Sequence, residues 1–223
     1  MISIAIDGPA GAGKSSLSRA AAKELGFLYA DTGALYRTIG LYLLRQGAEL
    51  DSITDWDGLL KDLRVTIGFV EGEQHVYLNG EDVSALIRTP EVSMMASAAS
   101  AKPPVRAHLL EMQRQLAREN DVLMDGRDIG TVVLPEATVK IFLTASPEER
   151  ARRRYEELLE KGQTVTFEEV YEDMVQRDYN DSHRAVAPLK PAEDSVTVDT
   201  TGLEIHESLA LLLKTIRERM NRA

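Results

Sequence analysis

The sequence predicts an α/β fold, built on a doubly wound sheet of five parallel strands. Five short apolar runs alternate with stretches of helical periodicity, which is typical of parallel strands joined by crossover helices that cover both faces of the sheet. The first run leads directly into a glycine-rich turn and a helix, as expected where such a sheet begins. The 223 residues contain no repeats or low-complexity tracts, so we expect one domain with excursions.

Composition restricts the class of protein. The hydrophobic fraction of 43% and the charged fraction of 28% are ordinary for a globular protein. The net charge of −10 argues against a general nucleic-acid or membrane-surface binder. Cysteine is absent, which excludes disulfides and thiolate metal sites, and no apolar stretch approaches a signal peptide or a membrane span. We therefore expect a soluble, cytoplasmic protein with no nucleic-acid or membrane partner.

The first 63 residues follow the strand–helix alternation. The expected strands cover residues 1–7 and 27–31, and the expected helices cover residues 14–25, 33–45 and about 53–63. Gly26 and Gly47 supply the glycines that commonly end helices. Thr32 is a favourable residue type for the N-cap of the second helix.

A β-rich island then interrupts this alternation. Residues 64–70 and 74–78 alternate in polarity like the two strands of a hairpin, with Gly72 in their connection and an Asn79-Gly80 turn after them. Because the rest of the chain reads as strand and helix in turn, we interpret residues 63–80 as an insertion.

The remaining chain returns to the α/β pattern. The expected helices cover residues 90–101, 103–118, 147–161, 166–183 and 205–220, and the expected strands cover residues 121–125, 139–144 and 196–198. Ser146 and Pro147 open a helix in the preferred way. We predict a core formed by residues 1–32, 103–145 and 185–223, with excursions at 33–102 and 146–184.

The turn after the first strand matches the phosphate-binding pattern G-x-x-x-x-G-K-[ST] at Gly8, Gly13, Lys14 and Ser15. Glycines allow backbone N–H groups to point at phosphate oxygens, while the lysine reaches the terminal phosphates and the serine hydroxyl can ligate Mg²⁺. An ordinary turn rich in small residues would not require Lys-Ser at this point. The residues expected to bind the nucleoside triphosphate are Gly8, Pro9, Ala10, Gly11, Ala12, Gly13, Lys14, Ser15 and Ser16.

Two further segments follow predicted strands, whose carboxyl ends face the ligand in a doubly wound sheet. Thr32 and Arg37 could hold a second phosphate, or Thr32 could only cap its helix while Arg37 is solvated. The forked guanidinium of Arg127 can donate hydrogen bonds to a phosphate group. The neighbouring Asp128 can accept a hydrogen bond from an amino group or influence Mg²⁺ through water. Two acids and an arginine around Gly126 are difficult to explain by packing alone.

The segment 146–184 is rich in arginine for an acidic protein. Two sets of residues each share one helical face: Arg150, Arg153 and Arg154, and Arg177, Asp181 and Arg184. A mobile basic arm that closes over polyphosphate would need this layout, because phosphoryl transfer is catalysed mainly by positioning and charge. The alternative is intrahelical ion pairing with neighbouring glutamates: Glu148, Glu149, Glu156 and Glu157.

With these motifs in hand, the chain resembles the bacterial cytidylate kinases over essentially its whole length. The resemblance rests on the phosphate loop, on Asp31-Thr-Gly-Ala-Leu-Tyr-Arg37, on Asp125-Gly-Arg-Asp128, and on the segment from Arg177 to Leu189. It implies a P-loop nucleoside monophosphate kinase fold, with the β-rich insertion in the monophosphate-binding region and a helical lid at residues 146–184. It further implies a monomer that transfers the γ-phosphate of ATP, with Mg²⁺, to CMP or dCMP.

The resemblance also implies roles for individual residues. It places Ser97, Arg106 and Asp128 on the cytosine ring, Arg37, Arg127 and Arg184 on the α-phosphate of CMP, and Arg177 and Asp181 on its sugar. Ser97 and Arg106 carry little signal by themselves. The family's usual Asp-Ser-Gly has Thr32 in place of serine here, which retains a hydroxyl that can contact phosphate.

Other functions stay open at this stage. The nearest is a kinase on the same scaffold for another acceptor, such as UMP, AMP, shikimate or dephospho-coenzyme A. A nucleotide-driven switch is a different class, but the sequence lacks the guanine-reading N/T-K-x-D element and an apolar strand that ends in Asp-Glu. The four histidines share no spacing that suggests a metal site.

Overall fold

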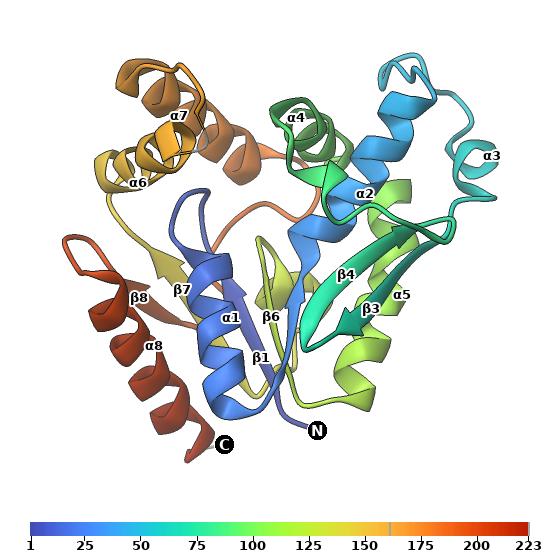
Figure 1. Cartoon of the computed structure of the whole chain (residues 1–223). Coiled ribbons are helices and arrows are strands. Elements are labelled where there is room, and N and C mark those ends of the chain that lie inside the picture. The colour runs from blue at the N-terminus through green and yellow to red at the C-terminus, as the bar shows by residue number, and fades with distance from the viewer. Residues whose placement is uncertain (161, 223) are drawn as a thin grey trace. The chain divides into compact units, whose positions relative to one another are not determined.

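The computed structural model describes residues 1–160 and 162–222. The chain forms two compact units (Figure 1). The first unit comprises Met1–Tyr29 and Asn120–Ala223, and the second comprises Ala30–Glu119. Residues 103–119 belong to the second unit, although they were predicted as part of the core. The division of the chain into core, excursions and lid stays a prediction.

The predicted five-stranded parallel sheet is confirmed. Its strands are β1 (Ser3–Asp7), β2 (Leu28–Asp31), β6 (Val122–Gly126), β7 (Val139–Thr144) and β8 (Val196–Asp199), in the order β2-β6-β1-β7-β8. The chain places β2 and β6 on one side of the central strand β1, and β7 and β8 on the other, which is the doubly wound arrangement. In the register, Asp7 lies beside Gly126 on one side and Phe142 on the other. The three central strands therefore end close to the same level.

Two helices of the first unit pack together on this sheet. The helices α1 (Lys14–Leu25) and α8 (Ile205–Met220) run side by side in Figure 1. Their apolar faces, including Leu17 and Ile216, bury against Ile4 and Ile6 of β1. Both helices have the bounds that the sequence predicted, because Gly26 in the left-handed conformation ends α1 and apolar periodicity defines α8.

The helices α6 (Pro147–Glu160) and α7 (Phe167–His183) pack together as a pair, within the segment predicted as the second excursion. Thr166 caps α7 and exchanges hydrogen bonds with Glu169 in a capping box. Position 161, the predicted end of the first of these helices, lies outside the described residues. Since α7 ends at His183, the extended residue Arg184 follows the helix, whereas the sequence analysis placed it on a helical face.

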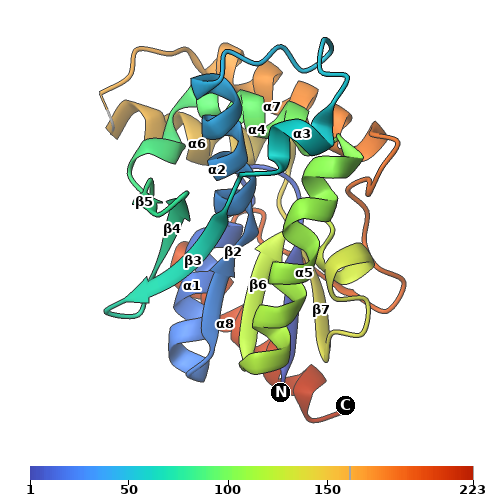
Figure 2. The ribbon, with the colours of Figure 1, turned by 90° about the vertical axis from the view of Figure 1, so that its right-hand side faces the viewer.

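The second unit combines helices with a small antiparallel sheet (Figure 2). Its helices are α2 (Thr32–Arg45), α3 (Trp56–Leu60), η1 (Leu86–Arg88), α4 (Pro90–Ala99) and α5 (Pro103–Glu119). The predicted hairpin is β3 (Val65–Val70) with β4 (Glu73–Leu78), and the Asn-Gly turn after it leads to a third strand, β5 (Glu81–Asp82). One face of the hairpin contributes Val76 and Leu78 to a core shared with α2 and α5.

A close approach of α2 and α4 organises this core. A Cβ atom built on Gly40 would lie 2.9 Å from the backbone nitrogen of Ala96 and 3.0 Å from the carbonyl oxygen of Val92. Only glycine permits this spacing between the two backbones. The contact holds α4 beside the part of α2 that carries Leu35 and Ile39.

Two predictions about helix ends were wrong. The N-cap of α2 is Asp31 instead of Thr32, because the Asp31 carboxylate accepts a hydrogen bond from the backbone of Ala34 at 2.9 Å. The helix predicted over residues 53–63 is confined to Trp56–Leu60. It begins where Asp55 caps the Gly58 nitrogen, and no side chain upstream offers an equivalent cap in the described structure.

A short π-helix, η2 (Ile129–Val133), follows β6 and was not predicted.

In the described part of the chain, no helix combines the length and apolar character needed to cross a membrane.

Candidate active site

The phosphate-binding pattern lies in the predicted context, a loop between β1 and α1 in the first unit. Gly8, Gly11 and Gly13 all have positive φ angles, of 154°, 70° and 78°. At Gly8 the requirement is also steric, since a Cβ atom would lie 1.9 Å from the carbonyl oxygen of Leu143. The loop therefore depends on glycine both for its conformation and for its close approach to β7.

Lys14 is the first residue of α1, and its side chain is buried. Its Nζ donates a hydrogen bond to the Pro9 carbonyl oxygen at 2.6 Å, so the lysine folds back over the loop. Burial and the positive charges of Arg127 and Arg177 lower the pKa of Lys14, while Asp125 and Asp7 oppose the shift. Three cationic side chains thus act on one another at this loop, which favours binding of anionic phosphate groups.

The next residue, Ser15, contacts a carboxylate from a neighbouring strand. Its Oγ donates to Asp125 Oδ2 at 3.1 Å, and the Tyr29 hydroxyl donates to Asp125 Oδ1 at 2.9 Å. A serine hydroxyl beside a carboxylate is the protein donor set that P-loop proteins use for Mg²⁺, with phosphates and water completing the shell. The two side chains therefore fit a magnesium ion. In the sequence, Asp125 was one of the two acids around Gly126 that packing does not explain, but it was given no specific role, and Ser15 alone was predicted to hold the metal.

Asp7, at the end of β1, is the second acid to which the sequence analysis gave no role. Its two carboxylate oxygens accept hydrogen bonds from the backbone nitrogens of Ile129 and Gly130, each at 2.7 Å. Burial raises the pKa of Asp7 to about 6, against the opposing effect of these two hydrogen bonds. The contact joins the start of the phosphate loop to the segment that follows Arg127 and Asp128.

Four of the predicted acceptor-binding residues pair with each other in the first unit. Arg127 Nε donates to Asp181 Oδ2 at 2.9 Å, and Arg184 Nη2 donates to Asp128 Oδ1 at 3.4 Å. Both carboxylates are buried. The fifth residue, Arg177 on α7, is exposed, and its charge acts on Lys14. The structure therefore joins the end of β6 to the end of α7, while the acceptor-binding roles of these five residues stay predictions.

The three arginines predicted on one face of α6 have different partners. Arg150 is buried and donates through Nη1 to the Ala10 carbonyl oxygen of the phosphate loop at 2.9 Å. Arg153 donates to the Thr200 carbonyl oxygen at 2.9 Å, in the loop between β8 and α8, and pairs with Glu149 at 3.2 Å within α6, as the alternative interpretation proposed. Arg154 pairs with Glu157 at 2.7 Å, one of the intrahelical pairs that the alternative interpretation proposed. Roles for Arg153 and Arg154 in ATP binding stay predictions.

In the second unit, Arg37 is held by the acid that caps its helix. Arg37 Nη2 donates to Asp31 Oδ2 at 2.9 Å, so Arg37 is not simply solvated. The Gln74 side chain of β4 makes two hydrogen bonds to the Asp31 backbone. Its Oε1 accepts from the Asp31 nitrogen at 2.7 Å, and its Nε2 donates to the Asp31 carbonyl oxygen at 3.2 Å. The β-rich insertion therefore supports the start of α2, where Thr32 also lies.

Ser97 and Arg106, also in the second unit, are linked through Ser100. The Arg106 side chain is buried, and its Nη1 donates to the Ser100 carbonyl oxygen at 3.3 Å. The Ser100 hydroxyl donates to the Ser97 carbonyl oxygen at 2.7 Å. The Arg106 guanidinium also lies 5.6 Å from the centroid of the Tyr36 ring, a cation–π distance. The resemblance placed Ser97 and Arg106 on the cytosine ring of CMP, and in the structure both lie at the C-terminal end of α4.

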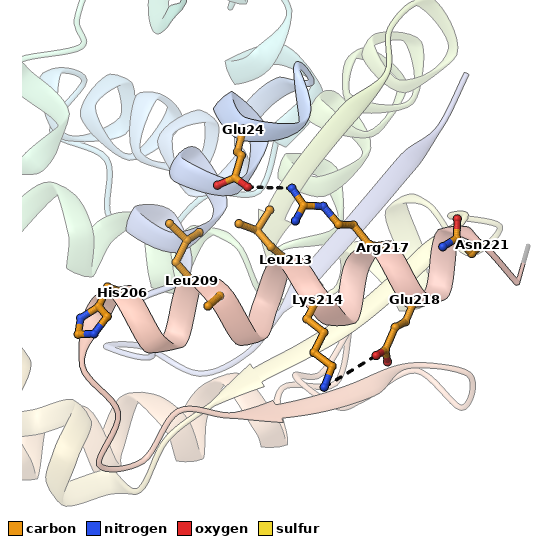
Figure 3. A pocket seen from close by; sticks show the side chains of 9 residues that line it. Glu24, His206, Leu209, Leu213, Lys214, Arg217, Glu218 and Asn221 are labelled. Carbon is orange, nitrogen blue, oxygen red and sulfur yellow. Dashed lines mark hydrogen bonds and ion pairs between the residues drawn. The ribbon is translucent and has the colours of Figure 1, made fainter.

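A hollow of about 520 Å³ lies elsewhere in the first unit, along α8 and the end of α1 (Figure 3). Its lining includes Leu209, Leu213 and the ion pair between Arg217 and Glu24, at 2.8 Å. Glu24 lies in the last turn of α1, whereas Lys14 opens that helix. The hollow is therefore separate from the phosphate loop and contains none of the predicted site residues.

Comparison with known proteins gives one consistent family. A family model described as cytidylate kinase matches residues 4–218. A cytidylate kinase of Carboxydothermus hydrogenoformans is 51% identical over 216 residues, with 96% of each chain covered. One from Thermosipho melanesiensis is 49% identical, with 97% of each chain covered. A gluconokinase structure from Sinorhizobium meliloti covers 99% of this chain and 94% of its own, with 14% identity and a TM-score of 0.50, so it is similar in fold alone.

Proposed function

The chain belongs to the cytidylate kinase family, and from this premise we propose that it transfers the γ-phosphate of ATP to CMP or dCMP. The products are ADP and CDP or dCDP. The observation that carries the proposal is the convergence of charge at Lys14, whose pKa is lowered by burial and by Arg127 and Arg177. Such a site offsets the repulsion between two phosphate-bearing substrates.

The chemistry fits the side chains at the loop. The acceptor phosphate oxygen of CMP is already anionic at neutral pH, so the transfer requires no strong general base. Lys14, Arg127 and Arg177 instead supply positioning and charge stabilisation, which account for most of the catalysis of phosphoryl transfer. The alternatives of another acceptor kinase or a nucleotide switch are not favoured by the family match.

For the donor, we propose that ATP binds the loop from Gly8 to Ser16, with Arg150, Arg153 and Arg154 contributing from α6. Mg²⁺ would be held by Ser15, as the sequence predicted, together with Asp125. The Ser15 Oγ and Asp125 Oδ2 atoms lie at hydrogen-bond distance from one another. When bound, the ion neutralises part of the negative charge of the triphosphate.

For the acceptor, we propose roles taken from the family resemblance for residues of both units. The residues are Thr32, Arg37, Ser97, Arg106, Arg127, Asp128, Arg177, Asp181 and Arg184. In the second unit, Asp31 orients Arg37, whose buried Nε has no hydrogen-bond partner among the described residues and could donate to phosphate. In the first unit, Asp181 orients Arg127 through Nε. Prior orientation of this kind lowers the entropy lost when an arginine binds phosphate.

A substrate panel tests the proposal directly. ATP and Mg²⁺ are supplied with CMP, dCMP, UMP or AMP, and ADP release is measured for each acceptor. CMP and dCMP should give the highest kcat/KM. A higher value for UMP or AMP would remove the cytosine assignment, and slow ATP hydrolysis that no monophosphate accelerates would favour a nucleotide switch. A monomeric state and a cytoplasmic location stay predictions, which light scattering and cell fractionation would check.

A further inference from the structure

Arg150 of α6 connects two elements that the proposed function assigns to different substrates. Its guanidinium donates through Nη1 to the Ala10 carbonyl oxygen of the phosphate loop at 2.9 Å, and the same Nη1 lies 2.6 Å from Asp178 Oδ2 on α7. A third contact, from Nε to the Ala145 carbonyl oxygen at 2.9 Å, fixes the orientation of the fork. The Arg150 side chain is only 5% exposed, whereas that of Asp178 is 22% exposed.

The helix α7 presents Asp178 between two residues of the proposed acceptor site. Arg177 directly precedes Asp178, and Asp181 follows it by three positions, which places Asp178 and Asp181 on one face. Asp181 pairs with Arg127 at the end of β6, whereas Asp178 pairs with Arg150. The same face of α7 is therefore linked both to an acceptor arginine and to the donor loop.

The packing around the loop leaves little freedom between these parts. Ala10, Ala151 and Met174 form a buried apolar cluster that joins the loop to α6 and α7. A Cβ atom on Gly11 would lie 2.8 Å from Met174 Cε and 3.0 Å from the carbonyl oxygen of Arg150. Because the loop, α6 and α7 are packed directly against one another, a shift of α7 must also move the loop or α6.

Asp178 is also poorly satisfied by the protein alone. Its Oδ1 is buried and has no hydrogen-bond partner in the described part of the chain, while Oδ2 serves Arg150. A buried carboxylate oxygen without a partner is unfavourable for stability. The pair between Asp178 and Arg150 both compensates the charge of the buried guanidinium and fixes its orientation.

We propose that Asp178 is a positioning residue that couples acceptor binding to the donor loop, by holding Arg150 against the Ala10 carbonyl. The inference rests on the proposed function, since it assigns ATP to the loop and CMP to Arg177 and Asp181. CMP held by Arg177 and Asp181 fixes the position of α7, and the Asp178–Arg150 pair transmits that position to the loop. Binding of either substrate then strengthens binding of the other by the same factor.

The test measures this coupling factor with ligands that cannot react. The dissociation constant of a non-hydrolysable ATP analogue with Mg²⁺ is measured by calorimetry with and without saturating CMP, on the full chain. The variants are Asp178→Ala, Asp178→Asn and the control Asp173→Ala, which removes an exposed carboxylate from the same helix. Thermal unfolding establishes that each variant is folded, and Asp178→Asn, being isosteric, replaces Asp178→Ala if the latter is not.

In the wild type, CMP should tighten binding of the analogue by about fivefold or more. Asp178→Ala should reduce this factor by at least about threefold, Asp178→Asn should do so to a smaller extent, and Asp173→Ala should leave it unchanged. The affinity for CMP alone should change less than about twofold in all variants. A coupling factor in folded Asp178→Ala equal to that of Asp173→Ala would overturn the inference, while CMP phosphorylation by the wild type would still support the proposed function. A wild type that does not bind CMP would overturn both.

Discussion

Asp7 is the residue for which the structure predicts an unusual dependence of stability on pH. Its side chain lies at the end of β1 with only 4% of the residue exposed, and it accepts hydrogen bonds from the Ile129 and Gly130 nitrogens. Burial disfavours the ionised carboxylate more than these two bonds favour it, so the pKa is raised from 3.8 to about 6. The substitution Asp7→Asn removes the charge and also replaces one of the two acceptor oxygens by a donor NH₂ group.

The magnitude follows from the difference between the two pKa values of Asp7, 3.8 and about 6. Each unit of this difference corresponds to about 1.4 kcal/mol, so the shift amounts to about 3 kcal/mol. The sign is that of a raised pKa: the folded state binds the proton more tightly. The contribution of Asp7 to stability is therefore fully present below about pH 4, and is lost as the pH rises through about 6.

Asn at this position cannot ionise, so Asp7→Asn lacks the pH-dependent contribution of Asp7, but its amide nitrogen cannot accept one of the two backbone hydrogen bonds, which costs about 1–3 kcal/mol at every pH. The free energy of unfolding of the wild type minus that of Asp7→Asn should therefore fall by about 2–3 kcal/mol between pH 4 and pH 7.5. Urea unfolding at these two values, on either side of the isoelectric pH of about 5.0, measures the difference. Asp173→Asn is the control for loss of an exposed carboxylate. A stability difference between Asp7→Asn and wild type that is the same at both pH values would refute the reasoning.

Two further substitutions test the donor loop and the second unit. Lys14→Ala should abolish turnover while leaving CMP binding largely intact, because the lysine serves the donor phosphates; loss of CMP binding in the folded variant, measured by calorimetry, would contradict this division of roles. Gly40→Ala should destabilise the protein, since a Cβ atom would lie 2.9 Å from the Ala96 nitrogen, and such overpacking costs about 1–3 kcal/mol against a gain of about 1 kcal/mol in helix propensity. Urea unfolding measures the net change, and a stabilised variant would show that α4 yields without cost.

The sequence was sufficient for the elements of the sheet and for most helices. Helix α1 was predicted to the residue because Gly26 marks its end, and α8 because its apolar periodicity is unbroken. The five strands were found because strands of a covered parallel sheet are short continuous apolar runs. These signals are local, so they can be read without knowledge of neighbouring elements.

The errors arose where two local signals compete or where the partner is distant. Asp31 and Thr32 are both good caps, and the structure distinguishes them, because the Asp31 carboxylate accepts from the Ala34 nitrogen and also pairs with Arg37. Periodicity also leaves the partners of Arg153 open: its guanidinium contacts both Glu149 in its own helix and Thr200, 47 residues away, and its role in ATP binding stays a prediction. Helical periodicity defines a face, and it does not say which neighbour that face meets.

Asp7, which was not recognised in the sequence, and Asp125, which was recognised only as part of the cluster around Gly126, show the same limit in the site itself. Asp7 and Asp125 each end an apolar strand, a position that packing alone would fill with another apolar residue. Their partners, Ile129 and Gly130 for Asp7 and Ser15 for Asp125, are more than a hundred residues distant. A buried carboxylate that is costly to ionise is expected mainly at a functional site, where its contribution to binding or catalysis offsets its unfavourable burial. An acid at the end of an otherwise apolar strand, next to a phosphate loop, is therefore itself a sequence signal for a site residue, even when its partner cannot be identified.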